Sequence, residues 1–173
     1  MLVFFMGFIA ANTYSQEKSK RELKKELKEK QKLEAQKITK NLVDSKSFVF
    51  VPVTALPSGM RSINLTSNYF EVSFQPEMIE SNLPFFGNAS ASMAYSSNDN
   101  GINFKEKPES YEMKNIKGNY EIEAVVKDNF DSYKLYLSIG SQGSASLRVI
   151  SNKRSVISYN GRISPLKDSI KNK

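Results

Sequence analysis

The pattern of apolar and polar positions divides the chain into segments of different character. Residues 2–11 form an uninterrupted apolar run, residues 17–44 repeat at a helical period, and most of residues 47–166 alternate at the period of a β-strand. Alternation of this kind is typical of strands with one buried and one solvated face. The sequence therefore predicts a mainly β protein with a charged α-helix before the sheet.

Seven short segments have the alternation expected of strands. Pro52 is expected to bend the first of them or to place it at a sheet edge. Asn100-Gly101 and Asn160-Gly161 are the strongest hairpin signals between strands. Short strands joined by such turns indicate a single antiparallel β-sandwich or small β-barrel over residues 45–166, followed by a tail at 167–173. The expected strands are 48–51, 63–65, 70–74, 120–126, 133–139, 145–149 and 156–159, with turns or connections at 115–118, 128–131, 140–143 and 151–154.

Residues 16–44 are expected to form the charged helix. The segment contains no Gly or Pro and is rich in Glu, Lys, Leu, Gln and Ala, which are good helix formers. Its apolar stripe is narrow, and a narrow stripe can bury only a small part of a helix. We expect Ile38, Leu42 and Val43 to dock on the β domain, while the Lys-rich first half stays in solvent.

The apolar run at the start of the chain predicts a secretory signal peptide over residues 1–15. The run is followed by Asn12-Thr13-Tyr14-Ser15, in which Thr13 and Ser15 supply the small side chains of a cleavage site. It is shorter than the about 20 apolar residues that cross a bilayer. We therefore expect export, to the periplasm or outside the cell, after cleavage behind Ser15.

The composition excludes several kinds of site. The chain contains no cysteine and no histidine. Nucleophile pairs that depend on histidine cannot form, and the usual zinc ligand sets are missing. Carboxylate chemistry and a carboxylate site for Ca²⁺ or Mg²⁺ remain open. We expect no cofactor, no resident metal and no enzymatic activity.

The net charge of +7 is concentrated at the two ends of the chain. Residues 17–40 carry ten Lys or Arg and five Glu, whereas residues 47–166 carry eleven charges of each sign. The basic helix has no aromatic residue, unlike many helices that lie on membranes, and its cations alternate with Glu. We expect no nucleic-acid partner, and a weak contact of residues 17–40 with a membrane surface stays an alternative.

Four residues are the candidate ligand-binding residues. Phe85 and Phe86 stand between a Pro and a Gly and can present an aromatic ring outward, although aromatic residues most often fill a core. Arg154 lies at a turn and, together with Tyr159, can bind a carboxylate or phosphate. The alternative for Arg154 is a surface side chain that supports the turn. We favour this structural role for Arg154, and core packing for Phe85 and Phe86.

Three further arrangements of residues carry weaker chemical signals. Glu121 and Glu123 share a strand face about 7 Å apart, a spacing suited to a glycosidase pair, but the wet face of a strand explains them as well. Asp128 and Asp131 bracket a turn and have too few ligands for an EF-hand calcium site. The sequence Ser164-Pro165-Leu166-Lys167 matches a Ser–Lys motif and is attributed to chance.

Several segments together resemble domain of unknown function family 4251, which is found in secreted proteins of Gram-negative bacteria. The resemblance covers roughly residues 40–163 and implies export and a single β domain, without implying an activity. Asn88 departs from the pattern, in which a basic residue often follows the Gly, and this argues against an anionic ligand there. The segments are LPFFG at 83–87, Gly101-Ile102-Asn103-Phe104, Tyr111, and LYLSIGSQGSASLRVISNKRSVISYNGRI at 135–163.

These observations favour a binding or protein-interaction module of the cell envelope. Its partner would be an envelope protein or a small ligand, bound near Phe85 and Phe86 or inside the β domain. A cavity in the domain would favour a ligand, whereas a filled interior would favour a protein partner or a structural role. A carboxylate-based hydrolase and a structural protein tethered to a membrane surface by residues 17–40 are the alternatives.

Overall fold

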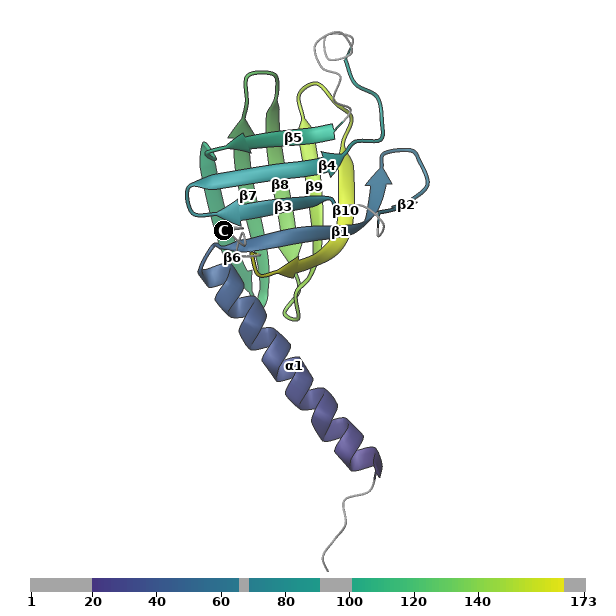
Figure 1. Cartoon of the computed structure of the whole chain (residues 1–173), viewed down its shortest axis with the longest axis vertical. Helices are drawn as coiled ribbons and strands as arrows, with labels where there is room; N and C mark the ends of the chain where they lie inside the picture. The colour runs from purple at the N-terminus through teal and green to yellow at the C-terminus, as the bar shows by residue number, and fades with distance from the viewer. Residues whose placement is uncertain (1–19, 66–68, 91–100, 167–173) are drawn as a thin grey trace, which may run out of the picture.

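The computed structural model describes residues 20–65, 69–90 and 101–166, which form one curled antiparallel sheet and one helix (Figure 1). The expected signal peptide at 1–15 and tail at 167–173 lie outside these residues. The mainly β architecture with a helix before the sheet is confirmed. The elements are α1 (Lys20–Asp44), β1 (Phe48–Pro57), β2 (Ile63–Asn64), β3 (Glu71–Gln75), β4 (Met78–Pro84), β5 (Gly101–Glu106), β6 (Ser110–Ile116), β7 (Asn119–Lys127), β8 (Ser132–Ile139), β9 (Ser144–Ser151) and β10 (Ile157–Ser164).

The sheet folds over on itself to form a half-barrel. Its strands follow the order β5-β4-β3-β1-β10-β9-β8-β7-β6, and β2 pairs with β1 outside this path. Strands β5, β4, β3 and β1 cross in front of β7, β8 and β9 (Figure 1). The two end strands, β5 and β6, are consecutive in the chain and are joined by residues 107–109. The curl therefore brings the two ends of the sheet together at one corner.

The space between the two halves is filled by side chains. The rings of Phe104 on β5 and Tyr133 on β8 stack with centroids 5.0 Å apart, which joins the two halves directly. Phe48 and Phe74 stack at the same distance within the front half. Every buried apolar residue of the core cluster is at most 8% exposed. A packed interior of this kind is stabilised by burial of apolar area at about 25 cal/mol per Å².

Strands β4, β5 and β6 are not among the strands that the sequence predicts. In β4, Ser81 points inward and is only 4% exposed, which breaks the apolar alternation. Its hydroxyl donates a hydrogen bond of 2.7 Å to the Ile102 carbonyl on β5, so the buried polar group is satisfied. In β6, six of the seven residues are exposed, so this strand has little apolar pattern to detect.

The junction between β1 and β10 corrects two expectations. β1 pairs with β10 on one side and with β3 and β2 on the other, so Pro52 does not mark an edge strand. Pro52 instead lies where the register shifts, which confirms a bend. Asn160-Gly161 is not a hairpin turn but lies within β10, opposite this shift. A Cβ added at Gly161 would lie 2.1 Å from the Val51 carbonyl oxygen, so the Gly serves the close approach of two backbones.

The turn expected at residues 115–118 is confirmed. Ile116 and Asn119 are paired across a two-residue loop, and both loop residues have positive φ, 53° at Lys117 and 82° at Gly118. These angles define a type I′ turn, whose twist matches that of the flanking strands. The Gly118 N–H donates a hydrogen bond of 3.0 Å to Asn115 Oδ1. The turn fixes the register of β6 on β7.

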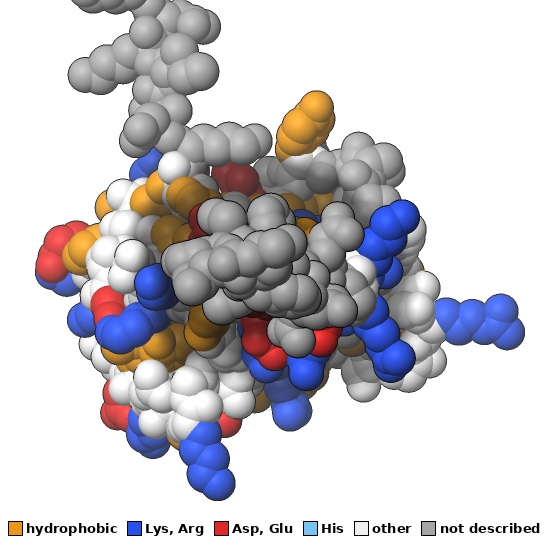
Figure 2. All heavy atoms as spheres, turned by 90° about the horizontal axis from the view of Figure 1, so that it is seen from below, with side chains coloured by type: hydrophobic (Ala, Val, Ile, Leu, Met, Phe, Trp, Pro, Cys, Tyr) orange, Lys and Arg blue, Asp and Glu red, His pale blue; other side chains and the backbone are white. Residues whose placement is uncertain are grey.

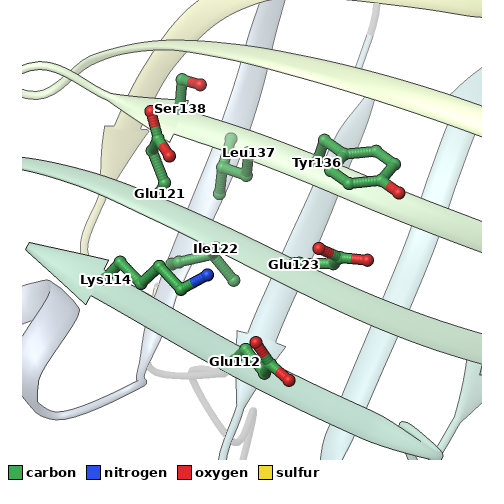
Figure 3. A pocket seen from close by; sticks show the side chains of 8 residues that line it. All are labelled: Glu112, Lys114, Glu121, Ile122, Glu123, Tyr136, Leu137 and Ser138. Atoms are coloured by element: carbon green, nitrogen blue, oxygen red, sulfur yellow. The ribbon is translucent and has the colours of Figure 1, made fainter.

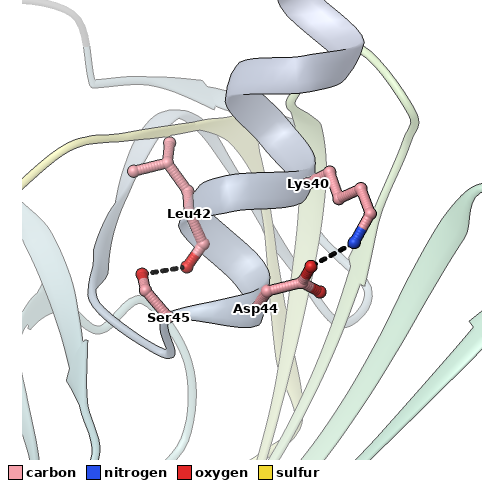
Figure 4. A network of polar contacts seen from close by, with 4 residues as sticks. All are labelled: Lys40, Leu42, Asp44 and Ser45. Atoms are coloured by element: carbon pink, nitrogen blue, oxygen red, sulfur yellow. Dashed lines mark hydrogen bonds and ion pairs between the residues drawn. The ribbon is translucent and has the colours of Figure 1, made fainter.

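Helix α1 is anchored to the half-barrel only by its C-terminal end. Thr39 and Val43 are buried and Leu42 packs against the core. Ile38 is 48% exposed, so its expected docking role is wrong, and Thr39 lies on the docked face instead. Lys40 forms an ion pair with Asp44, and the Ser45 hydroxyl donates a hydrogen bond of 2.9 Å to the Leu42 carbonyl (Figure 4). The Lys-rich first half is exposed, as expected, and extends away from the sheet (Figure 1).

Within the described part of the chain, no helix is both long enough and apolar enough to cross a membrane, and α1 is too polar to do so.

We expect Gly161→Ala to lower the free energy of unfolding by at least about 2 kcal/mol, because the added methyl meets backbone atoms that cannot rotate away. Urea denaturation of the purified protein measures this change. Gly140→Ala is the control, since the atom nearest to its added Cβ is the rotatable Ser144 hydroxyl, at 2.8 Å. An equal loss at both positions would contradict the account of the β1–β10 junction.

Candidate functional site

The structure brings the four candidate binding residues to one end of the half-barrel. The Arg154 guanidinium lies over the Phe85 ring, 5.1 Å from its centroid. The Tyr159 hydroxyl donates a hydrogen bond of 2.6 Å to the Pro84 carbonyl. Phe85 and Phe86 are both partly buried and pack against the core. The sequence analysis treated the aromatic pair and the pair of Arg154 and Tyr159 as two separate candidates. The structure brings them close together, although about 70 residues separate them in the chain.

Residues 87–90 are held against the connection between β9 and β10. The Ser155 N–H donates to the Asn88 carbonyl at 2.9 Å, and the Asn88 N–H donates to Ser155 Oγ at 3.2 Å. The Ser90 N–H donates to the Lys153 carbonyl at 2.8 Å. A Cβ added at Gly87 would lie 2.4 Å from Ser155 Oγ. These bonds of Asn88 use its backbone, so this segment is fixed without the basic side chain expected at position 88.

Asp131 holds the β7–β8 connection to the β9–β10 connection. Its carboxylate is part of a residue only 6% exposed and accepts hydrogen bonds from the N–H groups of Ser132 at 2.8 Å and Asn152 at 3.2 Å. It also accepts a short hydrogen bond from the Ser151 hydroxyl. Ser151 Oγ in turn accepts the N–H of Arg154 at 2.9 Å. The network links a buried carboxylate to the residue that covers Phe85.

The two aspartates examined as calcium ligands bind backbone amides instead. Asp128 Oδ1 accepts the N–H groups of Phe130 and Asp131, both at 2.6 Å. Within the described ranges, no three acidic residues are placed to share a metal ion. The arrangement favours the structural interpretation of this turn.

The same turn presents an aromatic residue that the sequence analysis missed. Phe130, at the tip of the β7–β8 connection, is 55% exposed. A large aromatic residue between Asn129 and Asp131 in a turn sequence is the signal that would have found it. We define the loop end as residues 85–90, 128–131 and 151–155, which lie at the end of the half-barrel opposite α1 (Figure 1).

Tyr159 is a core residue whose hydroxyl reaches the loop end. Its side chain is completely buried, so its ring packs in the core. Burial raises the pKa of the Tyr159 hydroxyl well above its usual value, and the nearby Arg154 partly opposes this shift. The neutral hydroxyl is therefore the favoured form, and it is already used as a donor to Pro84.

Glu121 and Glu123 lie in a separate hollow on the outer face of β6, β7 and β8 (Figure 3). The hollow has a volume of about 240 Å³. Glu112 and Lys114 on β6 complete its charged lining, and all four of these side chains are exposed. The structure therefore brings the predicted pair together with a third carboxylate and an ammonium group, in contact with solvent.

Asp131→Ala is expected to destabilise the fold by at least about 2 kcal/mol, because it leaves buried amide and hydroxyl groups without their acceptor. Chemical denaturation measures the loss. Asp44→Ala is the matched control, since Asp44 pairs with Lys40 in solvent and little change is expected there. Similar losses in both variants would mean that the Asp131 network does not stabilise the loop end.

Tyr159→Phe is expected to change the alkaline stability of the protein. The pKa of Tyr159 is raised in the folded state relative to about 10 for an unfolded Tyr. The neutral hydroxyl therefore contributes fully to the free energy of unfolding below about pH 10, and this contribution is lost as the pH rises further. The variant should lose about 1 kcal/mol at pH 7 and then decline less steeply above pH 10. Tyr69→Phe, at a residue 95% exposed, should keep the parent's slope. Urea titrations between pH 7 and 11 distinguish the two, and parallel curves for parent and Tyr159→Phe would refute the assignment.

Comparisons with known proteins place this geometry in a family. The sequence profile of domain of unknown function family 4251 matches residues 29–163, so the match begins within α1. The crystal structure of a protein of this family from Bacteroides eggerthii is similar, with a TM-score of 0.60 and 13% identity, over 76% of this chain and 87% of that one. At this identity the similarity concerns the fold. No curated protein matches the sequence. The chain belongs to domain of unknown function family 4251.

Proposed function

We propose that the chain is an exported, non-enzymatic interaction module of the cell envelope that binds a partner protein at its loop end. The main support is that Phe130 is exposed on a loop that is fixed by the buried carboxylate of Asp131. Exposed aromatic residues on a rigid frame are typical anchors of protein interfaces, because little conformational entropy is lost on binding.

The loop end combines aromatic and charged groups in a way that suits a protein surface. Phe85 and Phe86 are partly exposed, and Arg154 covers one face of Phe85. Aromatic residues and Arg are enriched at the centres of protein interfaces. The hydrogen bonds of Asn88, Ser155 and Asp131 hold the three segments in one arrangement before any partner binds.

The filled interior favours a protein partner over a small ligand. Small-ligand sites are mostly apolar cavities that enclose their ligand. Here the stacked pair of Phe104 and Tyr133 lies between the two halves of the sheet, and the apolar core residues around it are almost completely buried. Binding on the outside of the half-barrel is the arrangement that this packing supports.

The environment of the acidic residues favours binding over hydrolysis. A carboxylate pair that acts in hydrolysis needs surroundings that raise one of the two pKa values, which usually means burial. Glu121 and Glu123 are exposed beside Lys114. We therefore assign no reaction to this hollow.

Export and the exposed arm of α1 complete the proposal. The apolar run at residues 2–11 supports export. Lys and Arg side chains project from the face of the molecule on the helix side (Figure 2), and the first half of α1 is exposed. We assign this arm the role of a solvated spacer that leads to the half-barrel.

Site-specific photo-crosslinking tests the binding surface. A photoreactive phenylalanine derivative is placed at position 130 in cells that export the protein, and at the exposed Leu33 of α1 as a control. We expect one defined protein adduct from position 130, identified by mass spectrometry, and none of that mass from position 33. Phe130→Ala should keep the parent's stability, because the side chain is exposed, and should lose the partner.

Other crosslinking results would move the proposed binding surface or contradict it. An adduct from position 33 alone would move the interface to α1. Irradiation at position 130 without any adduct, or with an adduct to a second copy of the chain, would contradict the proposed partner site.

A further inference from the structure

Strand β6 is an exposed edge strand of the sheet. It pairs with β7 on one side, and no other strand among the described residues lies along its second side. Met113 is 37% exposed and Ile116 is 47% exposed. Edge strands that expose apolar side chains are templates for another strand.

The turn after β6 determines which backbone groups point away from β7. Ile116 and Asn119 close the two-residue turn, so this pair exchanges backbone hydrogen bonds. Hydrogen-bonded and non-hydrogen-bonded pairs alternate along an antiparallel ladder. The N–H and C=O groups of Tyr111, Met113 and Asn115 therefore point to the open side.

The outer face of β6 carries an unbalanced charge pattern. Glu112 lies directly opposite Glu123 on β7, and like charges in this position are destabilising. Lys114 lies opposite Glu121. The hollow is thus lined by three carboxylates and one ammonium group (Figure 3). A cation placed next to Glu112 on the open side of β6 would offset the repulsion between Glu112 and Glu123.

We propose that a second copy of this chain supplies it, by antiparallel pairing of β6 with β6 about a two-fold axis at Met113. The outward backbone groups of Tyr111, Met113 and Asn115 then meet their own counterparts. Glu112 of each copy faces Lys114 of the other, in the non-hydrogen-bonded pairs whose Cα atoms are about 4.5 Å apart. The two sheets become one continuous sheet.

The charges select this register over its neighbours. Shifting the axis by one residue keeps the backbone pairing but places Glu112 opposite Glu112, or Lys114 opposite Lys114. Charged residues on an edge strand normally prevent such pairing. Here the opposite charges are symmetric about Met113, so they permit one register and oppose the two adjacent ones. The loop end lies on other segments, and the inference is independent of the proposed partner site.

Charge reversal tests the pairing. Sedimentation equilibrium of the mature protein should give a dimer whose dissociation constant rises with salt. Glu112→Lys places Lys opposite Lys114, and Lys114→Glu places Glu opposite Glu112, so each variant should weaken the dimer at least tenfold. A one-to-one mixture of the two variants should restore the dimer, because every facing pair is again of opposite sign. Glu71→Lys, an equal charge change at an exposed site on β3, should dimerise like the parent.

A cysteine tests the register. The chain has no cysteine, so Met113→Cys introduces a single thiol that the two-fold axis places opposite itself. The Cα separation of such a pair, about 5.5 Å, suits a disulfide. Mild oxidation should link this variant into a dimer, whereas Ile116→Cys, whose thiol would face Ser110, should stay monomeric.

Contrary results overturn the proposal. These are a monomeric parent at hundreds of micromolar, single charge variants that dimerise like the parent, a mixture that stays monomeric, or faster linkage at position 116 than at position 113. A dimer that survives both charge reversals would assign association to another surface.

Discussion

The sheet can curl over because β1 and β10 approach each other closely at Gly161. These two strands join the front half of the sheet to the back half, and the register of β1 shifts at Pro52 directly opposite the Gly. A side chain at position 161 would collide with the Val51 carbonyl. The junction lets one sheet curl over, so that aromatic side chains from its two halves stack on each other.

The curl also determines which end of the half-barrel receives α1 and which end carries the loop end. One end of the half-barrel receives α1, which is held by Thr39 and Val43. The other end gathers the connections that carry Phe85, Phe130 and Arg154. Asp131 is buried between two of these connections, and its hydrogen bonds hold turns that are ordinarily flexible in one fixed arrangement. The core and the proposed binding surface are therefore stabilised by different interactions, one apolar and one polar.

The strands with a clear period were predictable from the sequence, and the others were not. β7 and β8 alternate between a buried and a solvated face, which is the signal that sequence patterns carry. β6 lacks that signal because it is exposed on nearly every residue, and Ser81 hides β4 by placing a hydroxyl in the core. The prediction of a hairpin turn at Asn160-Gly161 was wrong because the same dipeptide suits both a tight turn and a close contact between two backbones.

The candidate site was predictable in part. The LPFFG segment and Arg154 are distinctive in the sequence, and the fold places them in contact. That contact depends on the pairing of residues 87–90 with residues 153–155, which no local pattern indicates. The importance of Asp131 was hidden for a similar reason, since its partners Ser151 and Asn152 lie about 20 residues away.

The rigidity of the loop end can be measured by amide hydrogen exchange of the free protein. We expect the amides of Asn88, Asn152 and Ser155 to exchange slowly, as the amides of the central strands do, because each donates a hydrogen bond within the loop end. Exchange of these amides at the rate of an unstructured peptide, while the strands stay protected, would contradict this expectation.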